Sequence, residues 1–171
     1  MKRVWLSGMV LACFASGPLV AEEKAQIAAS AEIGRNVQLF ELPKGSRPHD
    51  VAPAPDGRIW YTAQKQGALG ILDPVSGKVV QLSLGPDSAP HGVIQGPDGM
   101  AWNTDGGQNA IVRYDPKNGK LDVWKLPEDT GYTNLNTGAF DKQGTHWFTG
   151  QNGIYGRVSA TDGKVRVWKD P

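Results

Sequence analysis

The sequence predicts an all-β fold, a β-propeller of which this chain holds about three four-stranded blades. The first observation is a 42-residue repeat: His49 and His91 lie 42 positions apart, as do Trp60 and Trp102. The second is that no helical periodicity is found after residue 35. The third is that 22 glycines and 12 prolines provide frequent turn residues between short runs of strand-forming residues. Four short strands in each 40–45 residues are typical of a propeller blade.

The first repeat predicts one blade over residues 43–84. Pro55-Asp56-Gly57 forms a turn because proline presets φ and glycine accepts a positive φ. Asp73-Pro74 and Ser76-Gly77 form another. Between these turns the sequence predicts strands at 49–54, 58–63, 68–72 and 78–84.

The second and third repeats predict blades over 85–126 and 127–168. The third is looser, since Trp147 follows Trp102 by 45 positions. The predicted strands are 91–95, 100–104, 110–114 and 120–126 in the second blade, and 135–140, 145–149, 154–158 and 164–168 in the third. A β-sandwich of similar strands is the alternative, but sandwiches rarely repeat their turn sequences so closely.

Residues 37–42 alternate in polarity like a strand, and we expect them to be the outer strand of the blade that closes the ring. Propellers usually have 4–8 blades. Three blades leave two broad apolar faces without a neighbour. The partial propeller, residues 37–171, therefore needs further blades or a partner to close.

The first 21 residues resemble a secretory signal. Lys2 and Arg3 precede a largely apolar run over 4–14, and residues 19–21 suit cleavage. The run is too short to span a bilayer. Cys13 is the only cysteine, and its surroundings match a lipid-attachment site poorly, so we do not expect a lipid anchor. The sequence predicts a periplasmic or secreted protein with a linker over 22–36.

The charge balance argues against nucleic acid as a partner. Without Lys2 and Arg3, the chain has 16 basic and 17 acidic side chains. No basic stripe is present that would neutralise phosphates. No basic patch suited to an anionic membrane surface is visible either.

Two histidines carry the candidate chemistry. His49 and His91 begin the innermost strands of neighbouring blades, which places both at one mouth of the channel. Imidazoles there suit general acid and base catalysis. The alternative is that each histidine hydrogen-bonds the turn of the next blade. Asn136 holds the same position in the third repeat, and we expect it to contact substrate together with Asp50.

Other recurring polar residues have structural interpretations. Asp56, Asp98 and Asp141 lie in turns, where an aspartate accepts hydrogen bonds from its own backbone. Asp105 is different, because it follows a strand near the predicted mouth. Carboxylate oxygens suit Mg²⁺ or Ca²⁺, so Asp105 is a candidate metal ligand. The aligned tryptophans and His146 are expected to pack between blades.

The motifs resemble those of the streptogramin B lyase (virginiamycin B lyase) family. They are Pro-His followed by Asp or Gly, Pro-Asp-Gly, Trp-x-Thr, and Lys-Val-x-x-Trp-Lys, and they span about 37–168. The resemblance implies a seven-bladed propeller that opens a cyclic ester antibiotic, and so confers resistance, by Mg²⁺-dependent elimination. It implies that His49 and His91 are catalytic and that Asp105 helps hold Mg²⁺. The family's acid two residues before the second histidine is replaced by Ala89.

Two classes of function remain open from the sequence. One is a carbon–oxygen lyase acting on a small-molecule cyclic ester, with His91 as base or acid and His49 orienting the substrate. The other is a propeller that binds a ligand or protein without catalysis, or an inactive fragment of an enzyme. Ala89 and the small number of blades favour the second class for this chain alone.

Overall fold

The computed structural model describes residues 37–159 and 161–170. The signal predicted over 1–21, Cys13 and the linker predicted over 22–36 lie outside the described residues. The chain divides into two compact units, residues 1–40 and 41–171. Among the described residues, no helix is long and apolar enough to cross a membrane.

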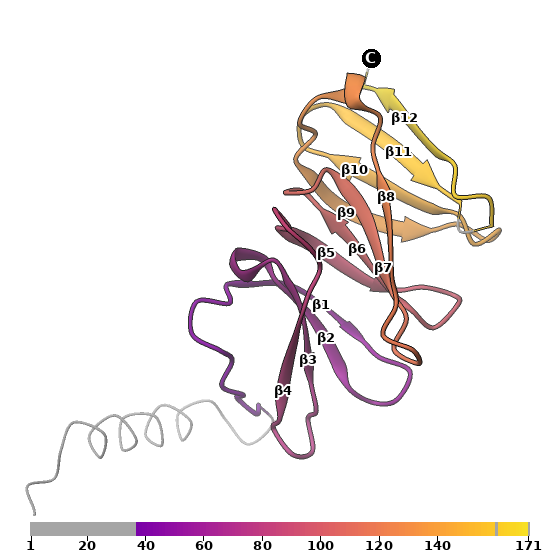
Figure 1. The fold of residues 1–171 in the computed structure, drawn as a ribbon. Coiled ribbons are helices and arrows are strands. Elements are labelled where there is room, and N and C mark those ends of the chain that lie inside the picture. The colour runs from indigo at the N-terminus through magenta and orange to yellow at the C-terminus, as the bar shows by residue number, and fades with distance from the viewer. Residues whose placement is uncertain (1–36, 160, 171) are drawn as a thin grey trace, which may run out of the picture. The chain divides into compact units, whose positions relative to one another are not determined.

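Three antiparallel four-stranded sheets follow one another along the chain (Figure 1). Each is a meander in which sequential strands pair, so the first strand of each sheet lies at one edge and the fourth at the other. The first sheet contains β1 (Pro48–Pro53), β2 (Ile59–Ala63), β3 (Ala68–Leu72) and β4 (Val79–Ser83), the second β5 (Pro90–Gln95), β6 (Ala101–Asp105), β7 (Ala110–Tyr114) and β8 (Leu121–Lys125), and the third β9 (Leu135–Phe140), β10 (His146–Gly150), β11 (Ile154–Val158) and β12 (Val165–Lys169). Two short 3-10 turns, η1 (Gln64–Gln66) and η2 (Glu128–Thr130), complete the elements.

The predicted all-β fold of about three blades is confirmed, and each of the twelve strands lies within about one residue of its predicted position. Local turn chemistry explains this agreement. In the first turn, the Asp56 carboxylate accepts a hydrogen bond from the Arg58 N–H at 3.1 Å. Gly57 has a φ of 85°, a left-handed conformation that glycine adopts readily. These short-range contacts end one strand and begin the next.

The strand predicted over 37–42 is wrong. The structure has no strand between residues 37 and 47. A strand needs a neighbour to satisfy its backbone groups, and each of the three sheets already has its four strands. The alternation of polar and apolar residues over 37–42 does not by itself provide a neighbouring strand.

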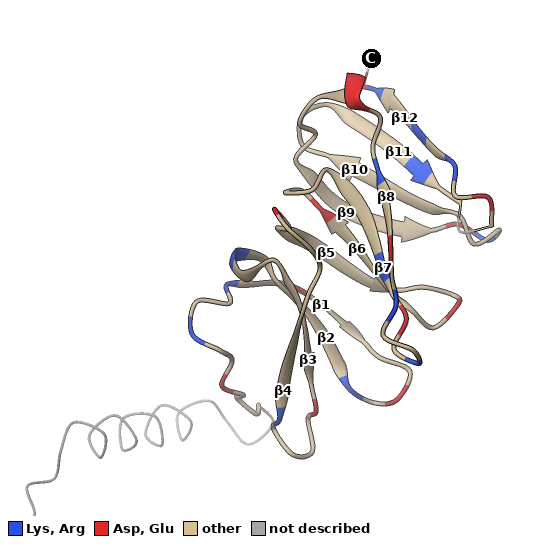
Figure 2. Cartoon of the chain, in the orientation of Figure 1, with Lys and Arg blue, Asp and Glu red and all other residues tan. Residues whose placement is uncertain are grey.

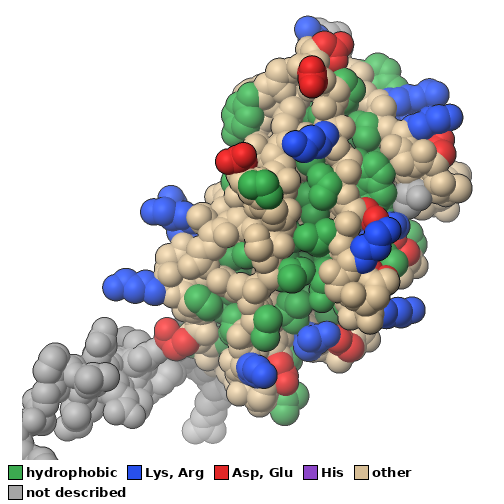
Figure 3. Space-filling view, viewed as in Figure 1, with side chains coloured by type: hydrophobic (Ala, Val, Ile, Leu, Met, Phe, Trp, Pro, Cys, Tyr) green, Lys and Arg blue, Asp and Glu red, His purple; other side chains and the backbone are tan. Residues whose placement is uncertain are grey.

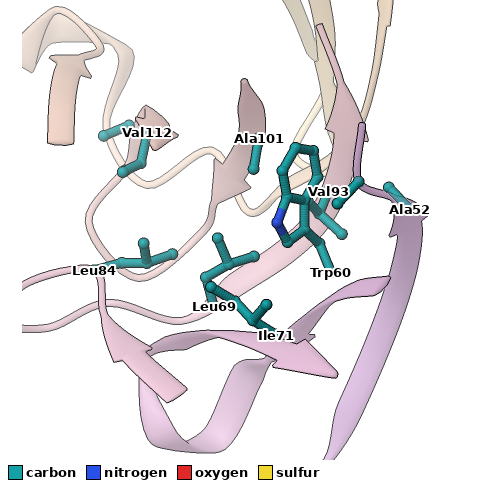
Figure 4. Packing of buried hydrophobic residues seen from close by; sticks show 10 residues of the cluster. Ala52, Trp60, Leu69, Ile71, Leu84, Val93, Ala101 and Val112 are labelled. Carbon is teal, nitrogen blue, oxygen red and sulfur yellow. The ribbon is translucent and has the colours of Figure 1, made fainter. Parts of the chain in front are cut away.

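The apolar core lies between successive sheets. In the first interface, Trp60 is fully buried and packs with Leu69 and Ile71 of its own sheet. The second sheet adds Val93 and Val112 to the same cluster (Figure 4). This packing buries side chains on both faces of a sheet, as expected for propeller blades.

The interface between the second and third sheets is rich in aromatic rings. Trp102 stacks on Trp124 of its own sheet with ring centroids 5.1 Å apart. From the third sheet, Phe140 meets Trp102 edge to face at 5.2 Å, and His146 stacks on it at 5.2 Å. The expectation that Trp102 and His146 pack between blades is therefore confirmed.

Charged residues gather in turns and on the outer strands (Figure 2). Arg113 of β7 forms ion pairs with Asp122 at 2.6 Å and with Asp98 at 3.2 Å. Because Asp98 also accepts a hydrogen bond from the Trp102 indole, it links a turn to the aromatic cluster. The structural interpretation of Asp98 is thereby supported.

Candidate functional site

The first strand of each sheet begins with a β-bulge. The pairing of β1 with β2 shifts between Pro48 and Val51, and that of β5 with β6 shifts between Pro90 and Gly92. His49 and His91 lie inside these two irregular segments. A bulge leaves a residue without a ladder partner and re-aims its side chain. The two imidazoles therefore need not follow the regular alternation of side chains between the two faces of a sheet.

His49 and His91 meet across the first two sheets. Their ring centroids are 3.7 Å apart with an interplanar angle of 42°. His49 is exposed and His91 is half-buried. The structure thus brings together the two histidines that the sequence predicts to be catalytic. A positive charge on the adjacent His49 would disfavour protonation of His91.

Burial lowers the pKa of His91 below its usual value, because a half-buried imidazolium loses hydration. The neighbouring His49 lowers that pKa further, whereas Asp50 and the backbone of Asn136 act in the opposite direction. The net result favours a neutral His91 near pH 7. A neutral imidazole has a free lone pair and can accept a proton.

Asp50 ties the first sheet to the second. Its Oδ1 accepts a hydrogen bond from the Val51 N–H at 3.0 Å, and its Oδ2 accepts one from the Val93 N–H at 3.3 Å. The carboxylate is half-buried beside the histidine pair. The bond to Val93 ties the carboxylate to β5, the strand that contains His91. The substrate contact predicted for Asp50 stays a prediction.

Two threonines with no role predicted from the sequence, Thr62 and Thr104, position the mouth. Thr62 accepts a hydrogen bond from the Asp50 N–H at 2.9 Å and donates one to the His91 carbonyl at 3.0 Å. Thr104 likewise accepts from the Gly92 N–H at 3.0 Å and donates to the Asn136 carbonyl. Each hydroxyl fixes the start of one sheet's first strand against the next. The recurring Trp-x-Thr spacing was the signal that could have revealed them.

Asn136 lies at the start of β9, one sheet further round from His91. Its carbonyl is the acceptor for Thr104, and its side-chain oxygen accepts a hydrogen bond from the Thr137 hydroxyl at 2.7 Å. The side chain is half-buried. His49, His91 and Asn136 therefore lie near the starts of β1, β5 and β9, the first strands of three successive sheets. Substrate contact by Asn136 remains a prediction.

Asp105 has a different environment from the one predicted. Its carboxylate is fully buried and accepts five hydrogen bonds. The donors are the Ser88 hydroxyl, the Ala89, Gly107 and Gln108 backbone N–H groups, and the Gln108 side-chain amide. Five donors use the lone pairs of both oxygens. Asp105 thus holds together the two loops that flank β5 and β6.

The described residues do not fit a Mg²⁺ site. Asp105 has no lone pair left for a cation, and both oxygens of Asp50 accept backbone hydrogen bonds. Within 37–159 and 161–170, no group of three or more histidine, cysteine or acidic side chains is placed to hold a metal ion. Mg²⁺ prefers several oxygen ligands in near-octahedral geometry. We therefore derive no chemical step through a metal from these residues.

His146 is a buried histidine with no catalytic access. Its side chain is 1% exposed, and neither ring nitrogen has a hydrogen-bond partner. Burial lowers its pKa to about 4, so the ring is neutral at pH 7. Gly138 makes room for it, because a Cβ there would lie 2.3 Å from His146 Nε2.

The comparisons with known proteins agree with the fold and the motifs. Residues 19–171 match the model of the Virginiamycin B lyase family. No match was found among the curated proteins.

Solved structures show the same likeness. A streptogramin B lyase structure is 26% identical with a TM-score of 0.69, covering 77% of this chain and 44% of that one. A catalytically inactive variant of virginiamycin B lyase from Staphylococcus aureus, with one histidine replaced by alanine and determined with quinupristin, is 29% identical with a TM-score of 0.70. That alignment covers 81% of this chain and 47% of the lyase. The chain thus spans less than half the length of these lyases, and by the match over 19–171 it belongs to the virginiamycin B lyase family.

Proposed function

We propose that this protein is a periplasmic or secreted lyase that opens a cyclic ester by elimination at the His49–His91 pair. The observation that carries the proposal is the contact of two imidazoles, 3.7 Å apart, at the start of neighbouring inner strands. Family membership supports the reaction class. In the related S. aureus lyase, replacing one histidine by alanine gives a catalytically inactive protein. The signal-like residues 1–21 support the location.

In the proposed reaction His91 is the general base. Its neutral imidazole takes a proton from the carbon next to the one that bears the ester oxygen. The C–H electron pair forms a carbon–carbon double bond, the C–O bond breaks, and the carboxylate leaves with its electron pair. No water is consumed. The imidazolium then returns its proton to solvent.

His49 orients the substrate in this proposal. It is exposed at the mouth and contacts His91, so it can hydrogen-bond a carbonyl of a ring lying across both strands. Asp50 and Asn136 are proposed substrate contacts on either side of the pair. Mg²⁺, which the family resemblance implies, would need ligands other than those offered by the described residues.

The test is the rate of ring opening of a streptogramin B cyclic depsipeptide by the full chain. We expect His91→Ala to lower kcat/KM by at least 10²-fold, since general base catalysis contributes about 10² to 10⁴. Gln95→Ala, an exposed change on the same strand, is the matched control and should leave the rate unchanged. Equal rates for wild type and His91→Ala would remove His91 from the mechanism.

A second candidate is ligand binding without turnover at the same mouth. The observation that favours it is Ala89, which stands where the family resemblance implies an acidic residue. Saturable binding of the same depsipeptide, with no product formed and with loss of binding in His49→Ala, would support this candidate over the lyase.

A further inference from the structure

The loop that leads into the third sheet is longer than its counterpart in the second repeat. Leu126 follows Leu84 by 42 positions, but Asn136 follows His91 by 45. The three extra residues therefore lie between Leu126 and Asn136, in loop 127–134, which contains η2. The repeat is thus altered next to the start of an inner strand, where the candidate site lies.

Tyr132 places an aromatic ring at the surface of this loop. The residue is 63% exposed. Asp87, 45 positions earlier, and Gly45, a further 42 positions earlier, are exposed as well, although another sheet follows each of them. This place in the repeat therefore lies at the surface even where a next sheet is present. The third repeat has a large apolar ring there instead of an acid or a glycine.

The backbone that carries Tyr132 is anchored on both sides. The Asn109 side-chain amide, from the β6–β7 loop of the second sheet, donates to the Gly131 carbonyl at 2.8 Å. The Asn152 side-chain amide, from the β10–β11 loop of the third sheet, donates to the Tyr132 carbonyl at 2.8 Å. The Asn152 N–H donates to the Thr133 carbonyl at 3.3 Å. These bonds fix the loop between two sheets without using the Tyr132 side chain.

The Tyr132 ring is oriented by its hydroxyl group. The hydroxyl donates a hydrogen bond to Asn134 Oδ1 at 3.1 Å. This bond occupies the polar end of the side chain and leaves the apolar faces of the ring free for contact. A ring that is already held in place loses little conformational entropy when a ligand binds. Tyr132 is therefore well suited to stack against a flat apolar group.

The loop lies at the same mouth as the histidine pair. Asn136 follows Tyr132 by four positions, and its carbonyl accepts a hydrogen bond from Thr104. Thr104 also accepts one from the N–H of Gly92, the residue after His91. Four residues of chain span at most about 14 Å. A macrocycle resting on the histidine pair can therefore reach Tyr132.

The charge of the loop restricts the group that can bind beside Tyr132. Glu128 and Asp129 of η2 are exposed and lie four and three positions before Tyr132. Figure 3 shows acidic and apolar side chains at the surface around η2. Two carboxylates raise the energy of an anion placed near them. The group that fits the ring is therefore an uncharged apolar or aromatic one.

We propose that Tyr132 is a substrate-binding residue whose ring stacks against an uncharged, flat apolar group of the cyclic ester while the ester lies across His49 and His91. This inference rests on the proposed function for the identity of the ligand. It gives Tyr132 a part in binding and none in bond breaking. Removal of the ring should therefore raise KM and leave kcat unchanged.

Isothermal titration calorimetry with a streptogramin B cyclic depsipeptide tests the proposal, with turnover of the same ligand measured in parallel. His91→Ala is the background for calorimetry, so that the ligand is not consumed. In that background we expect Tyr132→Ala to raise the dissociation constant about tenfold, because one aromatic contact is lost, and Tyr132→Phe to change it less than about twofold. Alanine keeps the Tyr132 carbonyl that Asn152 binds, so the loop should stay folded.

The matched control is Val75→Ala, which also removes an exposed apolar side chain. Val75 is 94% exposed and lies in the turn after β3, at the end of the first sheet away from the mouth. The dissociation constant should not change in this variant. Circular dichroism of each variant checks that it is folded.

The outcomes separate this proposal from the lyase function. Wild-type turnover together with an unchanged dissociation constant in Tyr132→Ala would overturn the role of Tyr132 alone. Weaker binding in Tyr132→Ala, with no product from wild type, would support the role of Tyr132 and remove the lyase function. Binding as weak in Tyr132→Phe as in Tyr132→Ala would show that the hydroxyl, and not the ring, makes the contact, and would overturn the proposal. No binding of the depsipeptide by wild type would overturn it too.

Discussion

At the scale of single residues, His146 makes the protein sensitive to acid. Its pKa is about 4 in the folded state, against about 6.5 for an ordinary histidine. Between these values the unfolded chain binds more protons than the folded one. Stability that is present above pH 6.5 is therefore lost as the pH falls toward 4. The full effect is about 3 kcal/mol.

Replacing the buried ring tests this assignment. In His146→Leu, we expect the free energy of unfolding to vary less with pH between 6.5 and 4 than in wild type. The measurement is urea denaturation at several pH values. Aspartates such as Asp122 and Asp141, whose pKa values are lowered by their hydrogen-bond partners, lose their contribution below about pH 4 and so lie outside this window. Equal pH dependence in the two proteins would refute the assignment.

The histidine pair has a titration signature of its own. Because His49 lowers the pKa of His91, we expect His49→Ala to raise the pKa of His91 toward its ordinary value. Because Asp50 raises that pKa, Asp50→Asn should lower it further. NMR titration of the His91 ring protons measures both shifts. Shifts of the opposite sign in either variant would contradict the geometry of the pair.

At the scale of the elements, the threonine bridges between sheets support the mouth. Thr104→Val keeps the side-chain shape but leaves the Gly92 N–H and the Asn136 carbonyl without their shared partner. A buried polar group that is left without a hydrogen-bond partner lowers the stability of the fold by about 1–3 kcal/mol. We expect that loss of stability in urea denaturation with an unchanged m-value. Thr149→Val, at the exposed counterpart, serves as the control and should change stability little.

The strands were predictable from sequence because their limits are set locally. Turns such as Pro55-Asp56-Gly57 are stabilised by contacts within a few residues, and those contacts can be inferred from residue types. The predicted strand at 37–42 failed for the opposite reason. Pairing depends on a distant neighbour, and alternation of polarity in Val37 to Leu42 carries no information about that neighbour.

The same distinction applies to the site. The 42-residue repeat was enough to place His49 and His91 on neighbouring strands, and the structure brings them into contact. The environment of Asp105 was not predictable, because its donors come from two loops that only the folded chain brings together. Position near the mouth suggested a metal ligand, whereas burial and five donors make this carboxylate a structural one.

At the scale of the whole molecule, the interfaces between sheets hold most of the apolar core. The first interface buries Trp60 and Leu69, and the second buries Trp102 and Leu135. Each sheet is therefore stabilised by its neighbours rather than alone, as in other repeat architectures. Within the described residues, Val51 of the first sheet and Tyr155 of the third are exposed on faces that no neighbouring sheet covers.

The mass of the product formed from a streptogramin B cyclic depsipeptide tests the central claim most directly. Elimination opens the ring without adding water, so we predict a linear product with the same mass as the substrate and a new carbon–carbon double bond. This product should be absent with His91→Ala. A product heavier by one water would show hydrolysis, and no product with wild type would show that the mouth of this chain does not catalyse ring opening. Either result would contradict the proposed elimination.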